Sequence, residues 1–466
     1  MSVEIISILV LVVVFLIATL TSAHMGALAL VAAFVVGTAV VGETPDEIFG
    51  GFPGDLFVIL AGVTYLFALA KNNGTVDWLV HVSVSAVRGR IALIPWVMFL
   101  VTALITAVGA VVPAAVAIIA PVGMGFAVRY RINPVLMGLM IINGASAGGF
   151  SPMSIFGGIT NGVVARNGLE GSPGLLFAGS FVFNVLLSLV VFFLFGGRSL
   201  IGRRGNGGAA SDDPPAAAGR PKTPASSRAD RLDAQSGGAF VARPEPGTAV
   251  ATAPDPAEPV ETGGSAITLT PERGLTVLGI IVLAVGALAF GLDVGLMAIT
   301  VAVALTLLSP KSSKGAVNQI AWPTVLLICG IVTYVSLMER MGTVDYLGDR
   351  VAAIGVPLLA AVLICLIGGA VSAFASTTGI LGALIPLAVP FLLGGEVGAI
   401  GMITALAISS SVVDSSPFST SGALVVANAP EEDRNRAFRH LMGWGMSMIV
   451  VAPLVTWSVL VVPGWL

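Results

Sequence analysis

The sequence carries little charge for its length. Of its 466 residues, 10% are charged and 56% are hydrophobic, whereas soluble domains carry about 25% charged residues. That difference excludes an ordinary soluble domain. Several uncharged runs reach the roughly 20 residues that a membrane-spanning helix needs, and they are solidly apolar rather than alternating, which excludes a transmembrane β-barrel. The composition therefore predicts an all-α polytopic membrane protein.

The chain is also poor in residues that bind metals, react or attract nucleic acid. Cys329 and Cys365 lie in apolar runs without metal-ligand spacing, which favours buried free thiols. His24, His81 and His440 are far apart and are predicted at membrane interfaces. A net charge of −3 gives no basic footprint for nucleic acid. No HExxH motif or suitably placed GxSxG motif occurs, so neither an enzyme nor a cofactor is indicated.

The composition changes abruptly between two apolar regions. Residues 1–199 form the first predicted membrane region, and residues 273–466 form the second. Between them, residues 200–272 are rich in Pro, Ala, Gly and Ser with scattered charges. Because such a segment cannot bury a core, it is predicted to be a disordered linker.

Uncharged runs predict where the first membrane region crosses the bilayer. The spans are expected at about 5–22, 24–42, 54–70 and 174–197. The first span is interpreted as retained rather than as a cleaved signal. The run from Ile91 to Val128 is too long for one span and barely enough for two. Gly109 and Pro113 interrupt it, so either two tightly connected spans or a re-entrant hairpin fits.

The second half of the sequence repeats features of the first in the same order. GTVD occurs at 74–77 and again at 342–345, and Ser151-Pro152 recurs 265 residues later as Ser416-Pro417. These agreements predict two repeats, with about 10 spanning helices and two re-entrant hairpins in all. Five through-spans in each repeat would invert the second repeat relative to the first.

The charges of the predicted loops orient this arrangement in the membrane. Lys and Arg concentrate on the side of the linker, which the positive-inside rule makes cytoplasmic, with both termini outside. Inverted repeats whose broken helices meet at mid-membrane are the architecture of secondary transporters.

Four interruptions in the membrane runs hold the candidate binding groups. Two are predicted hairpin tips, at 109–113 and 373–379, and two are unwound helix centres, at 143–154 and 409–421. Half-helix ends offer N–H groups to carboxylates and carbonyls to Na⁺. The alternative is that single hydroxyls bond back to their own helix. The candidate substrate-binding residues are Asn143, Ser151, Pro152, Ser154, Ser376, Thr377, Thr378, Ser416, Pro417, Ser419 and Thr420.

Asp414 is the only charged residue between Val397 and Asn428. An ionised carboxylate at membrane depth is costly unless paired, and no Lys or Arg lies in the neighbouring membrane runs. Asp414 must therefore be protonated, face water or hold a cation. It either caps the half-helix that starts near Ser416 or forms a coupling site for Na⁺ or H⁺.

Two further expectations concern the ion and the substrate. Ser376, Thr378 and Ser416 complete the candidate ion-coupling residues around Asp414. An anionic substrate would meet no fixed Arg clamp, so its charge would be balanced by helix ends, hydroxyls and a co-transported cation. The missing positive charge thus favours symport if the substrate is an anion.

The motifs resemble those of one transporter group. SPMSIFGGITNG in the first half, with ASTTGILGALIP and SSPFSTSG in the second, resembles the divalent-anion/Na⁺ symporters of the ion transporter superfamily. Within that superfamily, the first half, with GVTYLFALAKNNGTVDWL and NGASAGGFSPMSIFGGITNG, resembles the MatC-type dicarboxylate carriers. The resemblance implies a homodimer in a bacterial-type inner (plasma) membrane, with an elevator-like part that carries both hairpins and both broken helices.

The same resemblance implies which tip residues bind substrate. In the symporters a Ser-Asn-Thr type motif at each hairpin tip contacts substrate carboxylates and Na⁺. The second tip keeps hydroxyls at Ser376, Thr377 and Thr378 but lacks the Asn. The first tip departs entirely and reads AVVP, ending at Pro113. The expected function is secondary transport of malonate, malate or succinate with Na⁺ or H⁺; a citrate or inorganic-anion carrier, a channel or a membrane enzyme are the alternatives.

Overall fold

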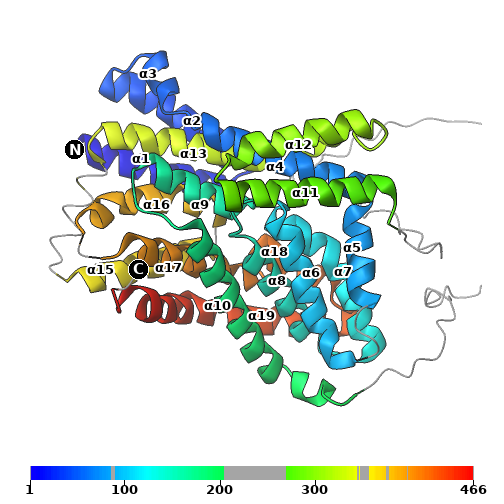
Figure 1. Cartoon of the computed structure of the whole chain (residues 1–466). Coiled ribbons are helices and arrows are strands. Elements are labelled where there is room, and N and C mark those ends of the chain that lie inside the picture. Colours follow the sequence, from blue (N-terminus) through cyan, green and yellow to red (C-terminus); the bar gives the residue numbers. More distant parts are fainter. Residues whose placement is uncertain are drawn as a thin grey trace, which may run out of the picture. The chain divides into compact units, whose positions relative to one another are not determined.

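The computed structural model consists of helices joined by turns (Figure 1). It describes residues 2–85, 90–203, 269–343, 346, 356–373, 377–395 and 397–464, and these residues contain no β-strand. They belong to one unit, which comprises Met1–Gly205 and Ile267–Leu466. Most of the predicted linker, residues 204–268, lies outside the described residues, as does the candidate site residue Ser376.

Six helical segments are long and apolar enough to cross a membrane. They are Gly54–Asn72, Val112–Tyr130, Pro173–Leu194, Trp322–Arg340, Ala399–Asn428 and Glu431–Val461. Shorter apolar helices of 10–17 residues accompany them. The described part of the chain thus has the all-helical, multi-pass character that its composition predicts.

The helices of the first half lie close to the predicted spans. They are α1 (Val3–Leu20), α2 (Met25–Val36), α3 (Pro45–Gly50), α4 (Gly54–Asn72), α5 (Thr75–Ser85), α6 (Ile94–Ala107), α7 (Val112–Tyr130), α8 (Pro134–Gly148), α9 (Ile155–Arg166) and α10 (Pro173–Leu194). A π-helical turn, Gly37–Val41, extends α2 to the end of its predicted span. Helix α5 follows α4 after a short turn, and residues 86–89 are outside the described part.

The second half contains eight described α-helices. Its helices are α11 (Pro271–Phe290), α12 (Val294–Leu308), α13 (Trp322–Arg340), α15 (Pro357–Ser372), α16 (Thr377–Leu393), α17 (Ala399–Val412), α18 (Thr420–Asn428) and α19 (Glu431–Thr456). A 3₁₀ turn, Val413–Ser415, follows α17, and a π-helical turn, Trp457–Val461, extends α19.

The long uncharged run from Ile91 divides into two helices at Gly109. This glycine has φ +119°, a left-handed conformation that other residues adopt only with strain. A Cβ atom on it would lie 2.2 Å from Cγ1 of Val63. Gly109 therefore has two roles. It ends α6 before α7 begins, and its missing side chain lets the turn lie directly against α4.

Helices from the two halves pack against each other in crossed pairs. In one pair α2 lies against α13, and Gly26 touches Gly330 so closely that a Cβ on Gly330 would lie 2.0 Å from the Gly26 carbonyl oxygen. In the other pair α12 lies against α4, and a Cβ on Gly62 would lie 2.8 Å from the Gly295 carbonyl oxygen (Figure 1). The second helix of each half therefore packs on a later helix of the other half, α2 on α13 and α12 on α4.

The interrupted helices cross in the same way. Helix α18 lies against α7, and α9 lies against α16. Each hairpin arm that follows a tip therefore contacts the half-helix that follows the break in the other half. This arrangement brings tips and breaks from distant parts of the sequence together.

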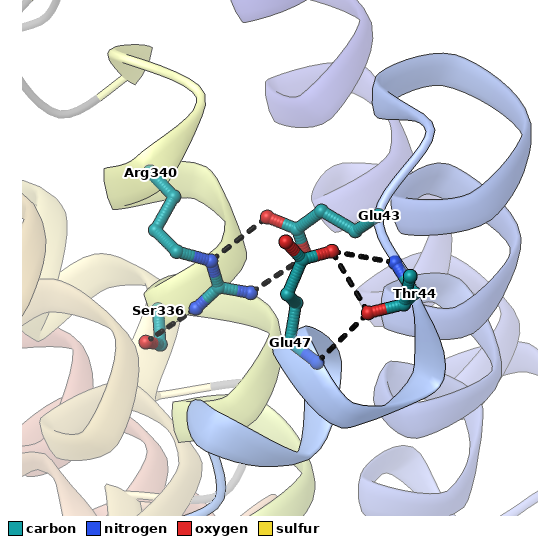
Figure 2. Close-up of polar contacts among 5 residues, drawn as sticks. All are labelled: Glu43, Thr44, Glu47, Ser336 and Arg340. Atoms are coloured by element: carbon teal, nitrogen blue, oxygen red, sulfur yellow. Dashed lines mark hydrogen bonds and ion pairs between the residues drawn. The ribbon is translucent and has the colours of Figure 1, made fainter.

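Ion pairs join the two halves and neighbouring helices on the surface. Figure 2 shows Arg340 of α13 facing Glu43, with Nε and Nη2 each 2.8 Å from a carboxylate oxygen, while Nη1 donates to Ser336. Hydrogen bonds from the backbone and side chain of Thr44, which form a capping box, hold the pKa of Glu47 below its usual value.

Candidate functional site

The break between α8 and α9 is a Ser-Pro-Met-Ser turn. Ser154 is the N-cap of α9, where its Oγ accepts from the N–H of Gly157 at 3.3 Å. The same Oγ donates to the carbonyl of Ser151 at 2.7 Å and contacts the carbonyl of Gly149. Gly157 is required because a Cβ there would lie 2.0 Å from the Ser151 carbonyl oxygen.

The break between α17 and α18 is a Ser-Pro-Phe-Ser turn with the same geometry. Ser419 is the N-cap of α18; its Oγ accepts from the N–H of Gly422 at 3.1 Å and donates to the carbonyl of Ser416 at 2.8 Å. It also contacts the carbonyl of Asp414 at 2.5 Å. A Cβ on Gly422 would lie 2.0 Å from the Ser416 carbonyl oxygen. Each contact has its counterpart 265 residues earlier.

Asp414 ends a chain of short oxygen contacts at the second break. Its side chain is buried, and Oδ1 lies 2.6 Å from Oγ1 of Thr377, the first residue of α16. Thr377 Oγ1 is 2.9 Å from the hydroxyl of Ser372 on α15, which in turn lies 2.7 Å from the carbonyl oxygen of Ser410. The second hairpin is therefore tied to the second break through the one carboxyl group.

A cavity of about 520 Å³ opens beside Asp414. It is lined by Ala18, Thr21, Ser22, Ala23, His24, Met25, Pro113, Phe156, Leu327, Thr377, Thr378, Asp414, Phe418, Ser419, Thr420 and Ser421. These residues come from the α1–α2 turn, both hairpins, the half-helix after each break, and α13. A volume of this size falls in the range of about 300–1,000 Å³ typical of small-ligand sites.

Several residues singled out from the sequence line this cavity together. They are Thr377, Thr378, Asp414, Ser419 and Thr420. The cavity therefore unites the second hairpin with the second break, as a common binding site requires.

Other candidate residues occupy structural positions near the site. Asn143 is buried on α8 and donates from Nδ2 to Ser188 Oγ at 3.2 Å. Ser151 and Ser416 accept the backbone N–H groups of the residues two positions on, each at 3.3 Å. Pro152 and Pro417 each belong to one of the two turns. Ser154 is buried and caps α9.

The cavity also holds His24, which escaped the sequence-based reasoning, and Ser421, which ends the predicted unwound segment 409–421. His24 was interpreted as an interfacial residue, yet it lines the cavity and its buried Nδ1 has no hydrogen-bond partner among the described residues. Ser421 is 1% exposed and its Oγ is likewise without a partner there. The only sequence signal for His24 was its position at the start of α2, where Ser, Thr, Asp or Asn is usual.

Two family models match the chain. The N-terminal model of the dicarboxylate carrier protein MatC matches residues 1–149, and the citrate transporter model matches residues 277–465. No curated protein matches the chain with significant similarity. The resemblance inferred from the motifs, to MatC-type dicarboxylate carriers of the ion transporter superfamily, is confirmed. Both families are transporters rather than enzymes, and the chain is a membrane-embedded multi-pass transporter of carboxylates.

Proposed function

We propose that this chain, matched by dicarboxylate-carrier and citrate-transporter models in its two halves, couples the transport of small dicarboxylates to protons. Malonate, malate and succinate are the proposed substrates. The observation that carries this proposal is the cavity that hydroxyls of the second hairpin and of α18 line together with Asp414, whose carboxyl group contacts Thr377.

The hydrogen-bond chain at Asp414 supports a proton as the coupling ion. Three close oxygen contacts link Asp414 through Thr377 and Ser372 to the carbonyl of Ser410. Each contact needs one hydrogen, and each hydroxyl supplies only one. Two hydroxyls leave one contact without a hydrogen unless Asp414 itself carries a proton. The chain is complete with a neutral carboxyl group, which is also the less costly form at membrane depth.

Loss of that proton supplies a switch between two arrangements. When Asp414 is ionised, Thr377 and Ser372 turn their hydroxyls toward the carboxylate, and the Ser410 contact loses its hydrogen. Protonation from one side and release to the other would then be coupled to rearrangement of the second hairpin against α17. Ser376, Thr378 and Ser416 remain the proposed neighbours in ion coupling, and Na⁺ at Asp414 is the alternative.

The crossed pairs and matched turns support two inverted repeats. Gly26 and Gly295 occupy equivalent places in α2 and α12, and they pack on α13 and α4 of the opposite half. We place residues 1–199 and 273–466 in these repeats, the α6–α7 and α15–α16 pairs as re-entrant hairpins, and about 10 helices as spans. The 200–272 linker is proposed to be cytoplasmic, with both termini outside.

Larger-scale motion and assembly follow from the same proposal. The hairpins and broken helices would move as an elevator against a scaffold built from the crossed α2–α13 and α4–α12 pairs. A homodimer in a bacterial-type plasma membrane would anchor that scaffold. Asn143, Ser151, Pro152, Ser154, Ser416 and Pro417 are proposed to support the substrate site, and Thr377, Thr378, Ser419 and Thr420 to contact substrate.

Uptake by proteoliposomes tests this function. Labelled malonate, malate, succinate and citrate are offered under an inward proton gradient, an inward Na⁺ gradient, or neither. We expect dicarboxylate accumulation that requires the proton gradient. Accumulation that requires only Na⁺ would replace the proton, preferential uptake of citrate would change the substrate, and no uptake under any gradient would overturn the function.

Replacing Asp414 by Asn tests the role of the proton separately. The amide cannot gain or release a proton, so gradient-driven accumulation should fall at least tenfold. Exchange of internal for external substrate should persist, because exchange needs no net proton movement. Unchanged gradient-driven accumulation would reduce Asp414 to a structural cap.

A further inference from the structure

The wall of the cavity formed by the α1–α2 turn differs chemically from the wall that holds Asp414. His24 lies on this turn and lines the cavity. Among the described lining residues it is the only one able to carry positive charge, since neither Lys nor Arg occurs there. The residues around Asp414 on the other helices contribute hydroxyls, which bind an anion only weakly by themselves.

The amino end of α2 adds donors beside His24. His24 is the N-cap residue, but its side chain makes no cap hydrogen bond, and the intrahelical ladder begins with Leu28 N–H bonding to the His24 carbonyl at 3.0 Å. The N–H groups of the first turn precede that ladder, and the helix dipole makes this end positive. In the other half the equivalent Asp293 caps α12 by accepting from Leu296 at 2.7 Å.

Two buried polar atoms around the same cavity lack partners. Both His24 Nδ1 and Ser421 Oγ are without hydrogen bonds among the described residues, and Ser421 is 1% exposed. Buried polar groups are almost always hydrogen-bonded in folded proteins. Because both residues line this cavity, a ligand with oxygen atoms bound there is the candidate partner for both groups.

We propose that His24 and the amino end of α2 bind a carboxylate group of the transported substrate. This inference rests on the proposed function and names the group that recognises the substrate's charge. The carboxylate accepts from the imidazole and from first-turn N–H groups, while Ser421 and Thr378 hydroxyls contact the rest of the polar ligand. Pro113 and Phe156, which line the same cavity, face its hydrocarbon part.

Exchange of labelled malonate at one fixed pH measures this role without a driving gradient. His24→Gln keeps a similar size but cannot become charged, so we expect KM to rise about tenfold with the maximal rate within twofold. His24→Lys places a positive charge at the same position and should recover most of that loss. His440→Gln is the matched control, since His440 lies on α19 and bonds to the Arg436 carbonyl. A KM for His24→Gln within twofold of the wild-type value would overturn the inference.

Histidine signals provide a readout that does not depend on transport. The chain has three histidines, so ¹⁵N-histidine labelling of the full chain in detergent gives ring signals assignable by single substitution. Adding malonate should shift the signal that is lost in His24→Gln and leave that of His440 in place. A His24 shift without any uptake would support the anion site and overturn the transport proposal. Uptake without a His24 shift would support the transport proposal and overturn the anion site at His24.

Discussion

The two helix breaks have the same backbone turn but differ in the side chains that surround it. Both are Ser-Pro-x-Ser turns whose second serine caps the following half-helix. Where the second half has Asp414, Thr377 and Ser421, the first half has Gly149, Val112 and Phe156 at positions 265 residues earlier. The comparison teaches that the Ser-Pro-x-Ser turn that interrupts the helix is present twice, whereas the polar groups that we propose bind the ion and the substrate are present once.

The packing shows why the first break cannot substitute for the second. A Cβ on Gly149 would lie 3.2 Å from the Phe156 ring and 3.3 Å from Val112 Cγ2. A carboxyl group there would meet apolar atoms instead of the hydroxyl that Thr377 offers Asp414. Phe156 therefore occupies, at the first break, the space that polar groups use at the second.

Replacing the glycine of either turn should have the largest effect. Gly157→Ala and Gly422→Ala each place a Cβ 2.0 Å from a backbone carbonyl oxygen. We expect a loss near the upper end of the roughly 1–3 kcal/mol typical of overpacked sites, read as a lower Tm in detergent. The matched control is Gly443→Ala, where a Cβ meets nothing within 4 Å. A clear difference between the two turn variants would break the structural half of the comparison.

Making the second hairpin resemble the first should impair transport selectively. Thr377→Val copies Val112 and removes the hydroxyl bonded to Asp414. A hydrogen bond to a charged or buried carboxyl group is worth about 1.5–3 kcal/mol, so we expect proton-driven uptake to fall at least about tenfold. Thr404→Val is the control, because Thr404 bonds only to the Ile400 carbonyl of its own helix. Equal uptake by both variants would contradict the assignment of the second half as the active one.

Removing either helix cap should have the smallest effect on stability and should sharpen the functional contrast. Loss of an N-cap hydroxyl costs about 1 kcal/mol, so Ser154→Ala and Ser419→Ala should lower Tm by similar amounts. Only Ser419 lines the cavity and contacts the Asp414 carbonyl. We therefore expect a higher substrate KM for Ser419→Ala alone. A matching KM change in Ser154→Ala would show that the first break also contributes to binding.

Local residue patterns were sufficient to predict the helices and their interruptions. Apolar runs of spanning length became helices within a few residues of the expected bounds, and Gly109 and the two Ser-Pro pairs interrupt them where expected. These features depend on neighbours in sequence. A long apolar segment in a membrane must form its backbone hydrogen bonds within its own helix, and glycine or proline interrupts that series of bonds. The convergence of Thr377, Thr378 and Asp414 was likewise predictable from the order of the repeats.

By itself, then, the sequence determined the helical class, the matched breaks and the single acidic residue at the second break. Only the tertiary structure decided that His24 shares a cavity with Asp414, 390 residues later, and that Phe156 closes the first break. Those contacts depend on which helices of opposite halves cross. The helices cross where four glycines allow their backbones to approach closely, at Gly26, Gly62, Gly295 and Gly330. Local sequence patterns do not predict these contacts, because the fit between two helices depends on the surfaces of both.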